Sequence, residues 1–390
     1  MAKVLNFGVI GCGMLARSMH IPNISRSKKA VLHTCCDISD EALAECKDKH
    51  GSLHISKDYN EVINNPEVDA LCVATIHELR LPIIAAAAKA GKPVYVEKPM
   101  AMNVKEVKEI GEVVKSANIP FCVGHNRRNS PAMAEAHGIF RGHMETPQGC
   151  KWRFDREGKE RPALAGDGVA AMSVRINDDW YSWKGWVFDE TIEVCRPMLF
   201  EMTHFTDLCN WFMAAEPLEV VALENDIWSS GVVIRYKTGE MATILMCSNG
   251  TFGYPKELYE MFGNGAAVVV DHMVEVRTVG IEGVEPRITY PMVNDKHPDV
   301  GGEGGIYGWL AKKRAACQEA AEKGDSWLQF TAEPNKGHAL AIENFIDEIN
   351  GDGPVVCGFD DAANATLVVF AAIKSAEEGR VVTIDEIWNS

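Results

Sequence analysis

Short apolar runs alternate with helical patterns over the first third of the chain. The apolar runs predict strands over Val4–Ile10, Ala30–Cys36, Ala70–Ala74, Val94–Val96 and Phe121–Val123. The segments between them carry helical spacing over Leu15–Ser25, Asp40–His50, Glu61–Asn65, Leu81–Ala90 and Val104–Ser116. Strands that alternate with helices are typical of βαβ units, which build a parallel sheet. Residues 1–125 are therefore predicted to form an α/β domain.

The pattern changes after residue 125. One open, mainly antiparallel sheet is predicted, with strands over Val220–Leu223, Ser230–Arg235, Met241–Met246, Leu258–Phe262, Ala266–Val270 and Val274–Thr278. Helices are predicted over Pro131–His143, Phe200–Ala215, Ile306–Lys323, His338–Ile349 and Ala362–Glu378. Residues 126–390 are thus predicted to be an α+β domain whose C-terminal helices can pack back on the first domain. Because strands such as Ala266–Val270 are wholly apolar, the sheet needs cover on both faces, and a homodimer or homotetramer is predicted.

Charge and cysteine content exclude several classes of protein. The 390 residues include 39 Lys and Arg against 55 Asp and Glu, a formal net charge of −16, which would repel nucleic acid and anionic membranes. We find no apolar stretch of about 18 residues and no signal-peptide pattern at the N-terminus. The 12 cysteines form no C-x-x-C unit and no cluster with histidine at metal-ligand spacing. Reduced thiols, a cytoplasmic location and no metal are therefore predicted.

A glycine-rich turn follows the first predicted strand. Its sequence, Gly-Cys-Gly-Met-Leu-Ala over residues 11–16, is a G-x-G-x-x-A pattern that also opens a predicted helix. Glycines at such a turn let the backbone approach a pyrophosphate, and the helix N-terminus attracts its charge. The predicted dinucleotide contacts in this turn are Gly11, Gly13, Met14, Leu15 and Ala16.

Asp37 ends the second predicted strand. A carboxylate at this place accepts hydrogen bonds from a ribose 2′-hydroxyl and repels a 2′-phosphate. The residues that follow, Ile38, Ser39 and Asp40, supply no positive charge. The predicted cofactor is therefore NAD rather than NADP.

Glu97, Lys98 and Pro99 directly follow the predicted strand Val94–Val96. The carboxyl ends of parallel strands face the ligand crevice of such a sheet. A lysine there can donate to a substrate oxygen and stabilise a developing negative charge. Lys98 is therefore a candidate for both substrate and cofactor binding.

These motifs belong to an ordered set that resembles the family of glucose–fructose oxidoreductase, inositol dehydrogenase and MocA-like oxidoreductases. The matching stretches are Gly11–Ala16, His20–Pro22, Ala74–Thr75, Ala90–Lys92, Glu97–Pro99, Asn126–Arg128, Glu201–Asp207, Glu343–Phe345 and Ser375–Arg380. They span nearly the whole chain. The resemblance implies a Rossmann domain over residues 1–125 and a second α/β domain over 126–390 that binds substrate and makes oligomer contacts through its sheet.

The resemblance also implies an activity, which is the oxidation or reduction of a secondary alcohol on a sugar, glycoside or cyclitol with NAD. The family lysine matches Lys98 and the family histidine matches His204. A neutral imidazole, which ordinarily titrates near pH 6.5, can remove the hydroxyl proton while a fixed lysine charge polarises the oxygen. Further cofactor contacts are expected from Thr75, His77, Glu97 and Asn126, although the residues after Thr75 depart from the family pattern.

The group that orients His204 stays open. Many family members have an aspartate four residues before this histidine, where the chain has Phe200. Glu201 lies three residues before His204 and Asp207 three residues after it. Residues three apart share a helix face, so either carboxylate can orient the imidazole.

Aromatic residues gather where a substrate contact is expected. The stretch contains Trp152, Trp180, Tyr181, Trp183 and Trp186, interleaved with arginine and aspartate. Flat aromatic faces beside polar groups suit a sugar, although tryptophan also fills cores and interfaces. The predicted substrate contacts are Arg127, Arg153 and Trp183, besides Lys98 and His204.

Two other functions remain open on the same residues. A glycosidase or lyase could oxidise its substrate transiently and return the hydride, holding NAD without net turnover. A non-catalytic NAD-binding regulator would keep the fold alone, which the presence of both Lys98 and His204 disfavours.

Overall fold

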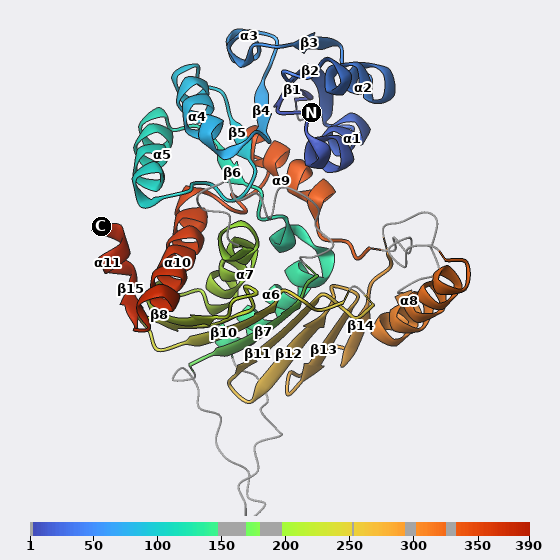
Figure 1. Cartoon of the computed structure of the whole chain (residues 1–390), viewed down its shortest axis with the longest axis vertical. Coiled ribbons are helices and arrows are strands. Elements are labelled where there is room, and N and C mark those ends of the chain that lie inside the picture. Colours follow the sequence, from blue (N-terminus) through green and yellow to red (C-terminus); the bar gives the residue numbers. More distant parts are fainter. Residues whose placement is uncertain (1–2, 147–168, 180–196, 252, 293–301, 325–332) are drawn as a thin grey trace, which may run out of the picture. The chain divides into compact units, whose positions relative to one another are not determined.

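The computed structural model describes residues 3–146, 169–179, 197–251, 253–292, 302–324 and 333–390 (Figure 1). The chain divides into two compact units. The first comprises Met1–Asn129 and Gly337–Leu367 with Ser390, and the second comprises Ser130–Lys336 and Val368–Asn389. The predicted domain boundary after residue 125 stays a prediction.

The first unit contains a six-stranded parallel sheet in the order β3-β2-β1-β4-β5-β6. Its strands are β1 (Leu5–Ile10), β2 (Ala30–Cys36), β3 (His54–Ser56), β4 (Ala70–Val73), β5 (Val94–Val96) and β6 (Phe121–Val123). Every residue of β4, β5 and β6 is buried, as expected for strands covered on both faces. The order reverses between β1 and β4, and loops at such a reversal bind ligands in doubly wound sheets.

Helices of the first unit begin and end at residues suited to those places. They are α1 (Ile21–Arg26, after a π-helical turn over Ala16–His20), α2 (Asp40–His50), α3 (Tyr59–Asn64), α4 (Arg80–Lys89), α5 (Val104–Ala117) and α9 (His338–Asn350). The Ser39 side chain caps α2 by accepting from the Ala42 N–H, and Gly51 ends that helix in the left-handed conformation. α4 packs on α5, and α9 packs on α1.

The second unit contains a nine-stranded sheet in the order β14-β13-β12-β11-β7-β10-β9-β8-β15. Its strands are β7 (Ala171–Asn177), β8 (Pro217–Glu224), β9 (Ser230–Tyr236), β10 (Met241–Cys247), β11 (Glu257–Gly263), β12 (Ala266–Asp271), β13 (Glu275–Val279), β14 (Arg287–Thr289) and β15 (Val382–Thr383). All six predicted strands are present. The prediction missed β7, which lies between β10 and β11 and pairs with β10 in parallel. The prediction also missed the short strands β14 and β15 of this sheet, and the short strand β3 of the first sheet.

One face of this second sheet is covered and the other is exposed. The helices are α6 (Pro131–Glu145), α7 (Pro197–Met213), α8 (Gly305–Glu322), α11 (Ile384–Trp388) and α10 (Phe359–Glu378), which begins in the first unit. α6 and α7 pack on the covered face, where Ala242, Ile244 and Met246 of β10 are buried (Figure 1). The opposite face, here called the outer sheet face, exposes Val221, Leu223, Met241, Leu245, Phe262 and Val279. The predicted oligomer stays a prediction.

None of the helices in the described ranges has both the length and the apolar character needed to cross a membrane.

Candidate cofactor and catalytic site

The glycine turn after β1 runs against the end of β4. Gly11 has a φ of +89°, and a Cβ atom there would lie 2.6 Å from the Ala74 carbonyl oxygen. A side chain is therefore excluded at Gly11 by both conformation and space. A Cβ atom on Gly13 would meet no heavy atom within 4 Å, so the turn is open at that residue.

The helix that follows presents its N-terminus beside this open space. The side chains of Met14 and Leu15 are exposed, whereas Ala16 is buried and fills the space between the helix and the sheet. The first N–H groups of a helix have no partner within it and favour an anion. The turn and helix thus have the open space and the N–H groups that a pyrophosphate needs, and the predicted contacts stay predictions.

Asp37 is fixed by backbone N–H groups at the end of β2. Its Oδ2 accepts from the Cys12 N–H at 2.7 Å, and its Oδ1 accepts from the Ser39 N–H at 2.9 Å. Each carboxylate oxygen retains a lone pair for a further donor, such as a ribose hydroxyl. Asp37 is therefore joined directly to the glycine turn, and its predicted contact with the ribose stays a prediction.

Arg80 connects the loops after β4 and β5. Its Nε and Nη2 donate to the Thr75 carbonyl at 3.3 and 3.2 Å, and its Nη1 donates to the Pro99 carbonyl. The side chain is 6% exposed, and this burial lowers the pKa of Arg80 to about 10, so it stays charged at neutral pH. Arg80 thus holds the two loops that carry Thr75 and Lys98. The buried Thr75 hydroxyl has no hydrogen-bond partner within the described ranges, which fits a cofactor contact.

Glu97 holds the main chain of Lys98. Its Oε1 shares a 2.7 Å hydrogen bond with His20 Nε2, and its Oε2 accepts from the Lys98 N–H at 3.1 Å. Burial raises the pKa of Glu97, but the hydrogen bond and charge of His20 outweigh it and lower that pKa to about 2. Glu97 is therefore a buried anion that positions Lys98, and its predicted contact with the cofactor stays a prediction.

His77 lies near the positive charges of Arg80 and Lys98. It belongs to a short 3₁₀ turn, His77–Leu79, that follows β4. Burial, followed by the charges of Arg80 and Lys98, lowers the pKa of His77 to about 3. The imidazole is therefore neutral at neutral pH and can offer either a donor or an acceptor to a ligand.

Asn126 and Arg127 lie in a buried 3₁₀ turn, Asn126–Asn129, after β6. The C-terminal segment of the same unit fixes this turn. Arg128 donates to the Val356 carbonyl at 3.0 Å, and the Asn344 side chain donates to the Asn129 side chain at 2.7 Å. The predicted contacts of Asn126 with cofactor and Arg127 with substrate remain predictions.

The predicted catalytic residues of the second unit share the helix α7. Glu201, His204 and Asp207 are all buried, and Asp207 has no exposed surface. Lys256, directly before β11, forms a 2.7 Å ion pair with Asp178 after β7, and its Nζ lies 3.9 Å from Glu201. Glu201 thus belongs to a cluster of buried charges at the ends of β7 and β11. The choice between Glu201 and Asp207 as the partner of His204 stays open.

The aromatic stretch falls outside the described residues. Arg153 and Trp183 are both in undescribed segments, as are Trp152, Trp180, Tyr181 and Trp186. Their predicted substrate contacts therefore stay predictions.

Sequence reasoning gave no role to Arg80 and His20 of the first unit or to Lys256 of the second. Lys256 directly precedes β11, which is a signal that could have drawn attention to it, whereas Arg80 begins α4 and His20 ends the π-helical turn. Their partners are not readable from the chain, since His20 and Glu97 are 77 positions apart.

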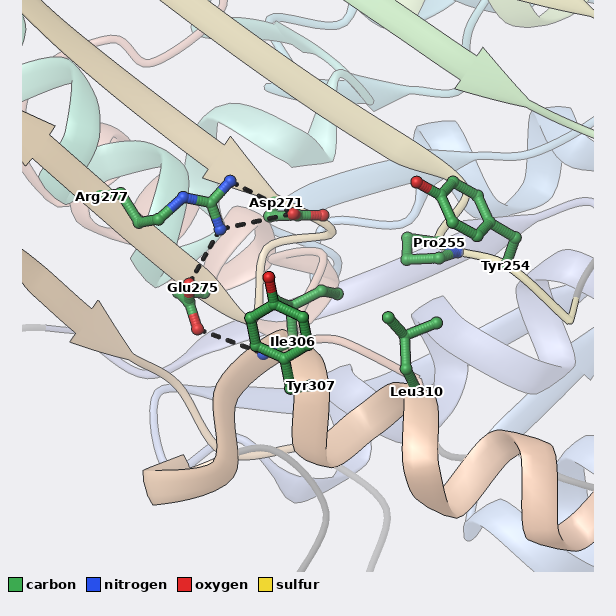
Figure 2. Close-up of a pocket in the computed structure, with 8 residues that line it drawn as sticks. All are labelled: Tyr254, Pro255, Asp271, Glu275, Arg277, Ile306, Tyr307 and Leu310. Atoms are coloured by element: carbon green, nitrogen blue, oxygen red, sulfur yellow. Dashed lines mark hydrogen bonds and ion pairs between the residues drawn. The ribbon is translucent and has the colours of Figure 1, made fainter.

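A separate pocket of about 340 Å³ lies in the second unit, between the sheet and the start of α8 (Figure 2). Arg277 lies 2.8 Å from Glu275 and 3.3 Å from Asp271, so its one positive charge is shared between two carboxylates of the wall. No predicted site residue lines it, and we assign it no part in the reaction. Its lining residues are Tyr254, Pro255, Asp271, Glu275, Arg277, Ile306, Tyr307 and Leu310.

Comparison with known proteins bears on the fold and the cofactor. Residues 5–125 match the model of a family described as an oxidoreductase family with an NAD-binding Rossmann fold. Myo-inositol 2-dehydrogenase of Thermotoga maritima is 27% identical over 98% of this chain and 99% of its own length. Inositol 2-dehydrogenase of Rhizobium meliloti is 22% identical over 97% and 99%.

Solved structures share the fold at low identity. Scyllo-inositol dehydrogenase from Lactobacillus casei with bound NAD(H) and scyllo-inositol has a TM-score of 0.70 at 17% identity, covering 98% of this chain and 100% of its own. A levoglucosan dehydrogenase complex with NADH and levoglucosan has a TM-score of 0.72 at 19% identity, covering 97% and 99%. The predicted fold class and the predicted cofactor, NAD, are confirmed.

Proposed function

Because residues 5–125 belong to the oxidoreductase family of glucose–fructose oxidoreductase, inositol dehydrogenase and MocA, we propose that this enzyme oxidises a secondary ring hydroxyl of a cyclitol or sugar. The observation that carries the proposal is the buried Glu97 that holds Lys98 at the end of β5, in the same unit as the NAD-binding turn. The likeness to myo-inositol 2-dehydrogenase over nearly all of both chains supports a cyclitol, and the levoglucosan dehydrogenase supports a sugar.

Bound NAD supplies the hydride acceptor for this reaction. Lys98 donates to the substrate oxygen and stabilises its alkoxide character as the carbon loses hydride. His204 removes the hydroxyl proton as a general base, and Glu201 or Asp207 orients its imidazole. The anion of Glu97 and the cation of Arg80 keep the loop of Lys98 in place without touching the substrate.

The same site holds the cofactor by three kinds of contact. The first N–H groups of the helix after Gly13 bind the pyrophosphate, and Asp37 accepts from the adenosine ribose. The Thr75 hydroxyl, which is buried at the end of β4, donates to a cofactor oxygen. Substrate contacts come from Arg127, with Arg153 and Trp183 outside the described part of the chain.

The assembly and location belong to the same proposal. The exposed apolar side chains of the outer sheet face support a homodimer or homotetramer, because a monomer would leave them in water. No disulfide joins the cysteines of the described ranges, which supports the reducing cytoplasm.

The test is substitution of the base. In His204→Ala, kcat should fall by about 10²–10⁴ while NAD⁺ affinity is retained, because the variant loses proton transfer alone. His143→Ala is the matched control, since His143 is similarly buried in the same unit but, among the described residues, its hydrogen bond is to the Asn264 carbonyl. Near-normal turnover by a folded His204→Ala enzyme would refute the role of His204.

A further inference from the structure

Three cysteines from three different elements meet beneath the glycine turn. Cys12 lies in the turn itself, Cys35 in β2 and Cys46 in α2. Their Sγ atoms all lie within 4.8 Å of one another, and none of the three residues has any exposed surface. The arrangement is therefore a closed group of three sulfur atoms inside the NAD-binding unit.

We propose that Cys12, Cys35 and Cys46 form a binding site for one soft, thiophilic metal ion. Thiolate sulfur selects soft ions over hard ones such as Mg²⁺ or Ca²⁺. With metal–sulfur bonds of about 2.3 Å, a trigonal site separates its sulfur atoms by about 4.0 Å. The sulfur atoms here lie no more than 4.8 Å apart, so small side-chain rotations bring them to that geometry.

The number of ligands narrows the class of ion. Within the described part of the chain, no fourth histidine, cysteine or carboxylate belongs to this group. A closed structural zinc site has four protein ligands, so a three-sulfur site suits ions that accept low coordination with sulfur, such as Cu(I) or Cd(II). Binding releases the thiol protons of the ligands to solvent.

The location connects the site to the cofactor turn. Cys12 contributes a sulfur atom to the group, while its own N–H donates to Asp37 at 2.7 Å. An ion at the cysteines would therefore be bound by the same residue that orients the carboxylate expected to bind the ribose.

Cd(II) alone is the probe for this site. The reduced, full-length protein is incubated with one equivalent of Cd(II), desalted against a weak chelator, and assayed for bound cadmium and for thiolate-to-cadmium charge-transfer absorption. A second sample is refolded with Cd(II) present, because burial of the three cysteines limits access of the ion to them in the folded protein. We expect one retained ion per chain, and an affinity lower by about 10²-fold or more in Cys35→Ala and Cys46→Ser.

Cys122→Ala is the matched control, because Cys122 is a buried cysteine of β6 at the opposite edge of the same sheet. It should retain cadmium like the wild-type protein, with circular dichroism confirming that each variant is folded. Absence of retained cadmium in both preparations would overturn the proposal, as would equal retention by folded Cys35→Ala and Cys46→Ser. Loss of two titratable thiols without bound metal would indicate a disulfide and would also overturn it.

Discussion

His20→Ala removes the only side chain that shares a hydrogen bond with the Glu97 carboxylate in the described structure. The two side chains are 1% and 8% exposed and their polar atoms lie 2.7 Å apart. The variant leaves a buried carboxylate with the Lys98 N–H as its remaining hydrogen bond. We therefore expect a large loss of stability in the first unit and a displaced Lys98.

The magnitude follows from the pKa of Glu97. Although burial raises that pKa, the hydrogen bond and charge of His20, followed by the charges of Lys98 and Arg80, lower it from 4.5 to about 2, a net shift of about 3 kcal/mol in favour of the charged form. Leaving a buried group without its hydrogen-bond partner costs about 1–3 kcal/mol, and more when the group is charged, which is of the same order. Because the folded-state pKa is depressed, this stabilisation is present above pH 4.5 and is lost as the pH falls toward about 2.

Hydrogen exchange is the suitable assay. The first unit contains no tryptophan, so intrinsic tryptophan fluorescence reports only on the second. At neutral pH, protection of the β5 amides should fall by roughly 10²-fold in His20→Ala, and the difference from wild type should shrink as the pH approaches 2.

His33→Ala is the control for this experiment. His33 is also buried in the first unit, but its nearby acid, Glu67, is 3.6 Å away and has a side chain that is 70% exposed. Equal losses in the two variants, or a difference from wild type that does not depend on pH, would refute the argument.

Three further predictions concern the cofactor, the assembly and pH. Asp37→Asn should lower the ratio of the NADP⁺ to the NAD⁺ dissociation constant by about tenfold or more, because it removes the charge that repels a 2′-phosphate; an unchanged ratio in equilibrium binding would contradict this. Light scattering should give a multiple of 42.9 kDa for the wild-type protein and 42.9 kDa for Leu245→Glu, and a wild-type monomer would exclude the oligomer. Burial raises the pKa of Glu348 to about 7, so the stability of the folded protein declines as the pH rises from 4.5 through 7. Glu348→Gln should therefore raise the melting temperature at pH 8 but not at pH 4, and equal changes at both pH values would contradict this prediction.

The sequence predicted the parallel sheet well because its central strands are buried on both faces. A strand such as β4 is then a continuous apolar run, which is readable without knowledge of its neighbours. The sequence of β7, Ala-Met-Ser-Val-Arg-Ile-Asn, alternates as a half-buried strand does, and the prediction overlooked this signal within a stretch that contains several glycine residues. Its parallel pairing with β10 depends on distant residues, and no local pattern encodes it.

The candidate site was predictable where one motif carries the chemistry. The turn at Gly11 and the carboxylate at Asp37 stand at fixed places after strands, so their spacing alone indicates a dinucleotide. The supporting contacts of Arg80 and Glu97 depend on side chains brought together from separate loops and helices. The cysteine group is of the same kind, since 34 positions separate Cys12 from Cys46 in the printed sequence.

The central claim is net hydride transfer from a ring carbon to NAD⁺. The most direct measurement uses cyclitols and cyclic sugars deuterated at each carbinol carbon, and follows NADH absorbance together with the label in cofactor and product. We predict one deuterated NADH for each ketone formed, with both lost in Lys98→Ala. Product formed without net NADH would indicate a glycosidase or lyase that returns the hydride, and bound NAD with no turnover on any substrate would indicate a regulator; either result would contradict the account.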